Sequence, residues 1–382
     1  MTKPFIDIIL TRMKWIDTSY SRRGFLKLGA LSLGALVLRP WNNWSQLLDE
    51  FPNAEQLGRI CVGKVDVRSR PSVDAESVGV LYEDAIVVWL REVVGEAPMG
   101  RQSRRWVETP DGYVYAPSVQ PVRNQPNVPV TEMPQTGLGK GMWVEVSVPQ
   151  TQIFLERDTA ASAWLQYALD YGLVPRLYYS QVIWVDDIRT SSQGQVLYRI
   201  NERYGPGDLF WAAAEAFRPL TDEEISPISP EVENKKVVVD VTPTRQILSL
   251  YEGNSEVYAC RISSGAKWNA EGAIVEEWGT PIGSNHRIWR KMISTHMSGG
   301  QTGTGYDLPG VAWTTLFTGE GVAVHSTFWH NDFGTPRSHG CVNCAPDDAK
   351  YVFRWTLPEI PYDPGDMTIA MPGGTQVDIV EA

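Results

Sequence analysis

Short runs in which apolar and polar residues alternate dominate the chain from about residue 58 onward. Residues 143–148, with the sequence WVEVSV, alternate strictly, which predicts a half-buried β-strand. Similar runs recur, separated by turn signals such as Asp111-Gly112. Between residues 141 and 220, residues 160–171 are the one helix-like insert among these strands. The pattern therefore predicts a mainly β protein.

Breaks in this pattern predict the domain organisation. Residues 58–123 form one compact set of short strands, and residues 141–222 form a second β-rich set after a proline-rich linker. A third set, residues 234–373, follows another cluster of prolines. A chain of 382 residues is long enough for several domains of this size.

The N-terminal residues 1–40 have the composition of a targeting segment. Residues 21–27, SRRGFLK, match the twin-arginine export signal, and the apolar run 28–38 follows them. That run is shorter than the roughly 20 residues that span a bilayer, which favours a signal over a permanent anchor. No clear small-x-small cleavage site follows it, so retention as a membrane tether stays open. We expect a protein of the cell envelope.

Charge and cysteine content narrow the choice of partners. The net charge of −11 speaks against a nucleic acid partner, and no basic run occurs outside the N-terminus. Four cysteines are too few and too scattered for a disulfide framework. We expect neither a structural metal nor a cofactor.

Candidate chemistry is concentrated in one stretch. Residues 321–324 form a short apolar run that delivers His325, and a polar loop returns the chain to Cys341 sixteen positions later. A thiol becomes a strong nucleophile when a nearby imidazole takes its proton. Gly340 lets a carbonyl approach closely, and backbone N–H groups around Gly340 and Cys341 could hold an oxyanion. Residues from Pro346 onward read as the start of a helix.

Other interpretations of these residues stay open on the sequence alone. A single cysteine is usually a small buried apolar residue, and a single histidine is usually a structural polar residue. His325, His339 and Cys341 could also be three zinc ligands, with His330 as a fourth.

The same residues carry a family resemblance. His325, followed by a loop and the run Ser338-His339-Gly340-Cys341-Val342-Asn343, closely resembles the active-site signature of the L,D-transpeptidase (YkuD-type) catalytic domain. Residues 279–283, GTPIG, match that family's Thr-Pro-x-Gly turn, and the resemblance spans residues 234–373. It implies a β-rich catalytic domain with Cys341 as nucleophile and His325 as base. The implied oxyanion and supporting residues are Gly340, Ser326, Ser338, His339 and Asn343.

The resemblance also implies the reaction, which serves cell wall biogenesis. Peptidoglycan stem peptides are the implied substrates, and the implied chemistry passes through a thioester on Cys341 to a cross-link. Substrate-groove candidates are His296, Met297, Tyr306 and Trp329, the first three on a loop that we expect before the His325 strand. A rival on the same site is an L,D-carboxypeptidase that gives the thioester to water. A rival from another class is a non-catalytic wall-binding protein.

Residues 67–72 and 112–114 resemble the bacterial SH3-like module, and the segment 141–222 could be a second one. Neither segment offers a nucleophile paired with a histidine. We therefore expect the two β segments to attach the enzyme to the wall without taking part in the chemistry. A fragment starting near Asn234 should then be active alone.

Overall fold

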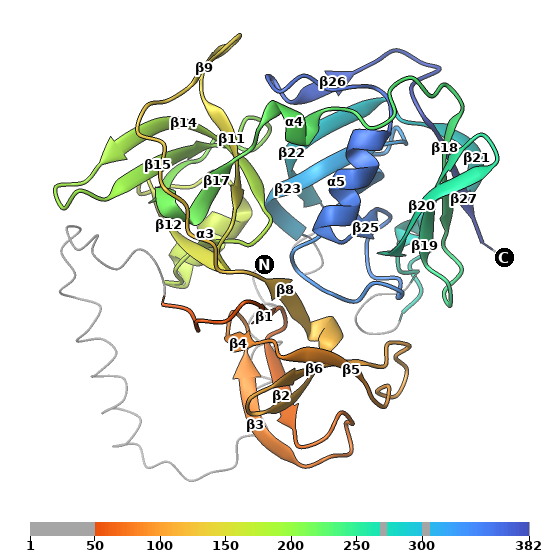
Figure 1. The fold of residues 1–382 in the computed structure, drawn as a ribbon, viewed down its shortest axis with the longest axis horizontal. Coiled ribbons are helices and arrows are strands. Elements are labelled where there is room, and N and C mark those ends of the chain that lie inside the picture. The colour runs from red at the N-terminus through yellow and green to blue at the C-terminus, as the bar shows by residue number, and fades with distance from the viewer. Residues whose placement is uncertain (1–49, 268–272, 300–305, 382) are drawn as a thin grey trace, which may run out of the picture. The chain divides into compact units, whose positions relative to one another are not determined.

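The computed structural model describes residues 50–267, 273–299 and 306–381. The predicted export signal lies outside these residues. The fold class is confirmed, because the described chain is mainly β and forms five sheets with a few short helices (Figure 1). Within the described ranges, no helix has the length and apolar character needed to cross a membrane.

The first β domain contains two small sheets, in the strand orders β4-β1-β8 and β3-β2-β7-β6-β5. Its core includes Ile60, Val67, Val107 and Val114. Its elements are β1 (Leu57–Ile60), β2 (Lys64–Arg68), β3 (Ser77–Tyr82), β4 (Ile86–Val88), β5 (Arg91–Val94), β6 (Arg105–Thr109), β7 (Gly112–Tyr115), the 3-10 turn η2 (Ala116–Ser118) and β8 (Val119–Val122).

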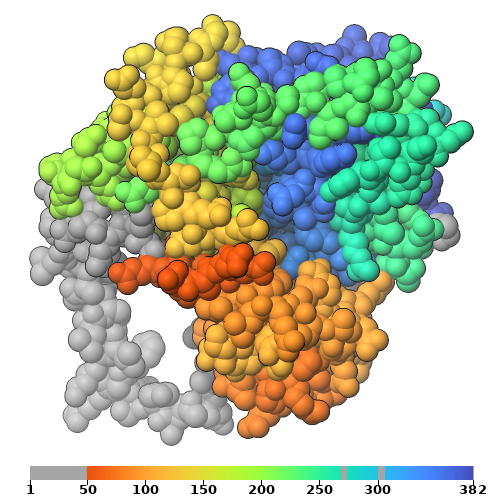
Figure 2. Space-filling model, viewed as in Figure 1, coloured from red at the N-terminus to blue at the C-terminus, as the bar shows by residue number. Residues whose placement is uncertain are grey.

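The second β domain is built on a seven-stranded sheet, in the order β13-β12-β16-β15-β14-β11-β17. Phe51 packs against its core, and Figure 2 shows the red start of the described chain lying along the yellow residues of this domain. Its elements are β9 (Gln135–Thr136), β10 (Gly139–Lys140), β11 (Met142–Val146), β12 (Gln150–Leu155), α3 (Ala163–Asp170), β13 (Arg176–Tyr178), β14 (Val182–Thr190), β15 (Val196–Asn201), β16 (Leu209–Ala213), η3 (Ala214–Ala216), β17 (Phe217–Pro219) and α4 (Asp222–Ile225).

The C-terminal domain is built on a ten-stranded sheet, in the order β21-β27-β18-β19-β20-β25-β24-β23-β22-β26. Helix α5 begins at Pro346 as predicted and packs against β23, β24 and β25 (Figure 1). The elements are β18 (Lys235–Asp240), β19 (Ile247–Glu252), β20 (Ser255–Ser263), η4 (Glu276–Trp278), β21 (Gly283–Arg287), β22 (Arg290–Gly299), β23 (Tyr306–Leu316), β24 (Ala323–Ser326), β25 (Val342–Cys344), α5 (Pro346–Trp355), β26 (Asp366–Thr368) and β27 (Gln376–Val380).

Strand β11 is buried on both faces, although its alternation predicted a half-buried strand. Met142 and Val144 enter the core of the second β domain. Trp143, on the opposite face, enters a different core together with residues of the C-terminal domain. Glu145 is the polar residue of the alternation, and Arg218 pairs with it. An alternating pattern cannot reveal that a second domain covers the other face.

One core joins the second β domain to the C-terminal domain. Its buried members from the second β domain and the adjoining segment are Trp143, Val182, Trp184, Leu220 and Ile225. Its buried members from the C-terminal domain include Val237, Leu248, Ile293, Trp313 and Phe353. A fragment starting near Asn234 would lose these first five residues and expose the apolar side chains that they cover, so the expectation that it stands alone does not fit the structure.

The segment before the His325 strand is also different from what we expected. Residues 294–297 and 306–310 were expected to lie on a loop, but they belong to β22 and β23, which pair as a long antiparallel hairpin. Strand β22 is rich in Ser, Thr, Met and Gly, which hides it from propensity arguments. Pairing with β23 on one side and β26 on the other overrides that weak propensity.

Candidate active site

Two neighbouring strands bring His325 and Cys341 to one face of the sheet. Strand β24 carries His325, and it pairs in parallel with β25, with His325 opposite Asn343. Side chains two residues apart share a face, so Cys341, just before β25, lies on the same side as Asn343 and His325. Strand spacing and rise give roughly 8 Å between the Cα atoms of Cys341 and His325. An imidazole and a thiol pointing from one face can meet across that separation.

The hydrogen bond of His325 selects the tautomer that a base needs. Its Nδ1 lies 2.9 Å from the backbone oxygen of Ser326, which can only accept, so Nδ1 carries the proton. The lone pair of Nε2 is then available to a proton donor. His325 is 2% exposed, and burial lowers its pKa to about 4. At neutral pH the imidazole is therefore unprotonated.

Cys341 is a protonated thiol in the resting structure. Burial raises its pKa, and the backbone N–H of Ala323 offsets part of this effect. Its Sγ is also 3.9 Å from the Gly321 oxygen. A neutral thiol and a neutral imidazole suit proton transfer during attack, because the base is free to accept the proton at that moment.

The turn before Cys341 is held from two sides. Thr280 donates to the Gly340 oxygen at 2.7 Å and accepts from the Gly265 N–H at 2.9 Å. Gly340 has φ +124°, a conformation that residues with a side chain rarely adopt. Thr280 belongs to the upstream Thr-Pro-x-Gly turn, and through it that turn holds the backbone just before Cys341.

Ser338 uses the backbone groups of the same turn. It donates to the Cys341 oxygen at 2.5 Å and accepts from the Gly340 N–H at 3.1 Å. The Gly340 N–H, expected to face the oxyanion, is thus already bonded in this structure. The Cys341 N–H is the other backbone group expected there.

Aromatic rings lie around the Cys341 side of the site. The ring of His339 is 4.1 Å from that of Trp278 and 5.5 Å from that of Tyr306. Burial and the neighbouring Cys341 raise the pKa of Tyr306. Trp329 lies 5.7 Å from the His325 ring. Sequence reasoning missed Trp278, although it directly precedes the Gly279 turn.

Comparison with known proteins identifies the family of the C-terminal domain. Residues 234–379 match the family model described as the L,D-transpeptidase catalytic domain. The C-terminal domain is an L,D-transpeptidase catalytic domain. A search of curated proteins found no match to the chain.

Solved L,D-transpeptidase structures resemble parts of the chain at low identity. The catalytic domain from E. faecium is 22% identical, over 39% of this chain and 98% of that one, with a TM-score of 0.28. The protein from Mycobacterium smegmatis is 16% identical, over 48% of this chain and 90% of that one, with a TM-score of 0.28. The Mycobacterium tuberculosis protein is 15% identical, over 61% of this chain and 90% of that one, with a TM-score of 0.26.

One predicted groove residue of the transpeptidase domain is buried in an interface instead. The His296 side chain is 2% exposed, and both ring nitrogens face carboxylates, Nδ1 that of Glu202 at 3.0 Å and Nε2 that of Asp307. Burial alone would lower the pKa of His296, but these carboxylates raise it. His296 thus joins the transpeptidase domain to the second β domain and has no nitrogen left for a substrate. Met297, the next residue, is half-buried.

The remaining candidates support the strands of the site. Asn343 is 2% exposed, and its amide lies 2.9 Å from Nε2 of His330. Ser326 is equally buried and contributes its backbone oxygen to His325. In the part of the chain that the structure describes, no three His, Cys, Asp or Glu side chains come close enough together to hold a metal ion.

Proposed function

We propose that this protein is an exported peptidoglycan L,D-transpeptidase with Cys341 as its nucleophile and His325 as its base. The supporting observation is the parallel pairing of β24 with β25, which sets His325 opposite Asn343, two residues after Cys341. The Nδ1 bond of His325 to Ser326 leaves Nε2 to take the thiol proton.

The reaction follows from these two groups. As Nε2 of His325 takes its proton, the Cys341 sulfur attacks the stem-peptide carbonyl that precedes a terminal D-alanine. The carbonyl oxygen becomes an oxyanion, for which the Cys341 N–H is the backbone donor. D-Alanine leaves with the proton from His325, and a thioester remains on Cys341. An amine from a second stem then attacks the thioester carbonyl and gives up a proton to His325. The C–S bond breaks, the new amide bond is the cross-link, and Cys341 leaves as a thiol after it takes that proton back.

The two contributions to rate have typical sizes. General acid–base help from a positioned imidazole is worth about 10²–10⁴-fold. One well-placed oxyanion donor is worth about 10²–10³-fold. The rings of Trp278, Tyr306 and His339 support a groove for the stem peptide beside Cys341.

The envelope location belongs to the same proposal. Residues 21–27 support export by the twin-arginine route, with the first β domain as an SH3-like module that attaches the enzyme to the wall. Replacing both Arg22 and Arg23 by Lys should keep folded protein in the cytoplasm, as fractionation would show. Normal export of that double variant would contradict the route.

Mass spectrometry of disaccharide-peptides after incubation with the enzyme tests the reaction. Loss of D-alanine together with a new cross-linked dimer supports transpeptidation. Loss of D-alanine with only free tripeptide stems would make the protein an L,D-carboxypeptidase instead. No change by the active wild-type preparation would contradict both.

A further inference from the structure

The loop between His325 and Cys341, residues 327–338, is held by residues outside the transpeptidase domain. The Asn331 N–H donates to the Pro117 oxygen at 3.2 Å, and its side-chain amide donates to the Ala116 oxygen at 3.3 Å. Arg101 approaches the buried carboxylate of Asp332 at 3.7 Å. All three partners belong to the first β domain. The loop that separates base from nucleophile is therefore not shaped by its own domain alone.

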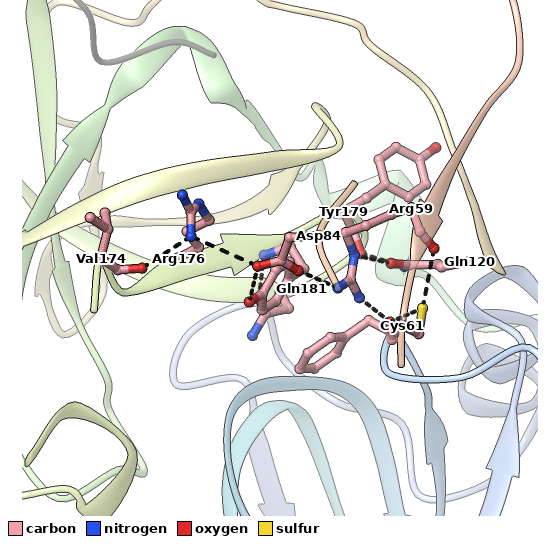
Figure 3. Close-up of polar contacts among 10 residues, drawn as sticks. Arg59, Cys61, Asp84, Gln120, Val174, Arg176, Tyr179 and Gln181 are labelled. Atoms are coloured by element: carbon pink, nitrogen blue, oxygen red, sulfur yellow. Dashed lines mark hydrogen bonds and ion pairs between the residues drawn. The ribbon is translucent and has the colours of Figure 1, made fainter. Parts of the chain in front are cut away.

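Arg59 of β1 makes a further buried contact with this loop. It is 3% exposed, and Nη2 donates to the Phe328 oxygen at 2.7 Å. Figure 3 shows its contacts with Gln120 and Asp84: Nε donates to the Gln120 side chain at 3.0 Å, and Nη1 donates to Asp84 at 3.0 Å. Each guanidinium nitrogen thus has a different partner, so the orientation of the group is fixed.

The second β domain holds the same loop residue from another side. The Tyr178 ring stacks on the Phe328 ring, with centroids 5.9 Å apart and planes at 22°. The guanidinium of Arg59 lies 4.0 Å from the Tyr178 ring centroid, and the Tyr178 hydroxyl donates to Asp84 at 3.1 Å. Phe328 is consequently fixed at both its carbonyl and its ring.

Phe328 is linked to the base through its neighbour. Its ring meets Trp329 edge to face, with centroids 5.0 Å apart, and the Trp329 ring lies 5.7 Å from that of His325. A shift of Phe328 would move Trp329 and admit water to His325. Burial is what keeps this imidazole unprotonated.

We propose that Arg59 is a positioning residue for acyl transfer, which holds Phe328 so that Trp329 covers His325 beside the Cys341 thiol. The proposal rests on the proposed function of Cys341 and His325. It gives the first β domain a part in catalysis, where the sequence predicted attachment alone. Burying an arginine costs free energy unless its N–H donors are paired. In Arg59, one of these donors is paired with the Phe328 oxygen of the catalytic loop.

The test compares full-length variants by their acylation with a carbapenem, followed as intact-protein mass. Arg59→Met should lower the acylation rate constant about tenfold or more, with little change in the concentration for half-maximal rate. Arg59→Lys should be intermediate, because an ammonium can still donate one bond to Phe328. Arg91→Met is the matched control, since Arg91 is an exposed arginine of the same domain paired with Glu108, and it should behave as wild type.

The pH profile separates positioning from general loss of structure. In wild type the rate should fall only near pH 4, as His325 becomes protonated. In Arg59→Met this fall should move at least about one pH unit higher, because a wetter His325 regains its ordinary pKa. A mere loss of folded protein would lower the amplitude without moving the profile.

A folded Arg59→Met variant with the wild-type rate constant and the wild-type pH profile would overturn the proposal. If Arg59→Met does not fold, Tyr178→Leu, which leaves Arg59 in place, decides by the same two readouts. Absence of an adduct on wild-type protein would instead contradict the proposed function of Cys341.

Discussion

The two β domains are joined to the transpeptidase domain by different kinds of interaction, the second by apolar packing and the first by hydrogen bonds. The second domain contributes Trp143, Val182 and Trp184 to a shared apolar core. The first domain has a separate small core and reaches the catalytic loop through polar groups, chiefly Arg59 and the Ala116 and Pro117 carbonyls. Apolar burial is worth about 25 cal/mol per Å², whereas a hydrogen bond contributes about 1 kcal/mol net.

This contrast separates stability from positioning. A shared core makes two domains fold together, because neither can bury its apolar face alone. A few directional bonds add little stability but fix the place of one carbonyl. The second domain is thus a structural part of the enzyme, and the first orients a loop of it.

Truncation should separate the two attachments most strongly. A fragment starting at Asn234 should be insoluble or unfolded, because it exposes the core that Trp143 and Trp184 cover. A fragment starting at Gln125 keeps that core and should fold, yet acylate about tenfold more slowly. Circular dichroism and carbapenem acylation measure the two properties.

If the Asn234 fragment folds and reacts like the full chain, the transpeptidase domain does not depend on the second β domain. If the Gln125 fragment reacts at the full rate, the first β domain contributes only attachment.

Paired tryptophan variants should sharpen the contrast. Trp143 is 2% exposed, packs edge to face on Trp184 and donates its indole N–H to the Tyr362 oxygen at 2.8 Å. Trp143→Ala should cost about 3–5 kcal/mol in the unfolding of both domains together. Trp106→Ala, at a 1% exposed site of the first domain, should unfold that domain alone.

Chemical denaturation followed by two probes checks this. Wild-type-like stability of Trp143→Ala, or separate transitions for the second and transpeptidase domains, would argue against a shared core.

The sequence predicted the local structure of the site better than its surroundings. The helix start at Pro346, the strand that carries His325 and the mainly β fold follow from local patterns. Contacts between residues far apart in the sequence do not follow from such patterns. Whether Trp143 faces water or another domain depends on a partner tens of residues away, and the role of Arg59 depends on a carbonyl 269 positions along the chain.

His296 shows why candidate residues were harder to assign. Its position before Cys341 resembled that of a groove residue, but its partner Glu202 lies in another domain. A polar residue in sequence carries no sign of whether a carboxylate will meet it in the fold. Arg59 did carry a weak signal, since it stands inside the otherwise apolar run Leu57–Ile60.

The smallest predicted effect concerns His296, a polar residue in the largely apolar interface between the second β domain and the transpeptidase domain. His296 meets Glu202 and Asp307, and Asp208 lies nearby. Because its folded pKa is raised, the stabilising charge is fully present below about pH 6.5 and is lost as pH rises through the folded pKa. The free energy of unfolding should therefore fall as pH rises above about 6.5, and His296→Gln should flatten that fall. An unchanged slope in His296→Gln would assign the pH dependence elsewhere.

The central claim, that Cys341 is the nucleophile, is tested most directly by intact-protein mass after carbapenem treatment. Cys344, three residues on, is the matched control, because it is fully buried in the shared core whereas Cys341 is partly exposed. We expect one adduct on wild type and on Cys344→Ala, and none on Cys341→Ala. An adduct that persists on Cys341→Ala but disappears from Cys344→Ala would contradict it.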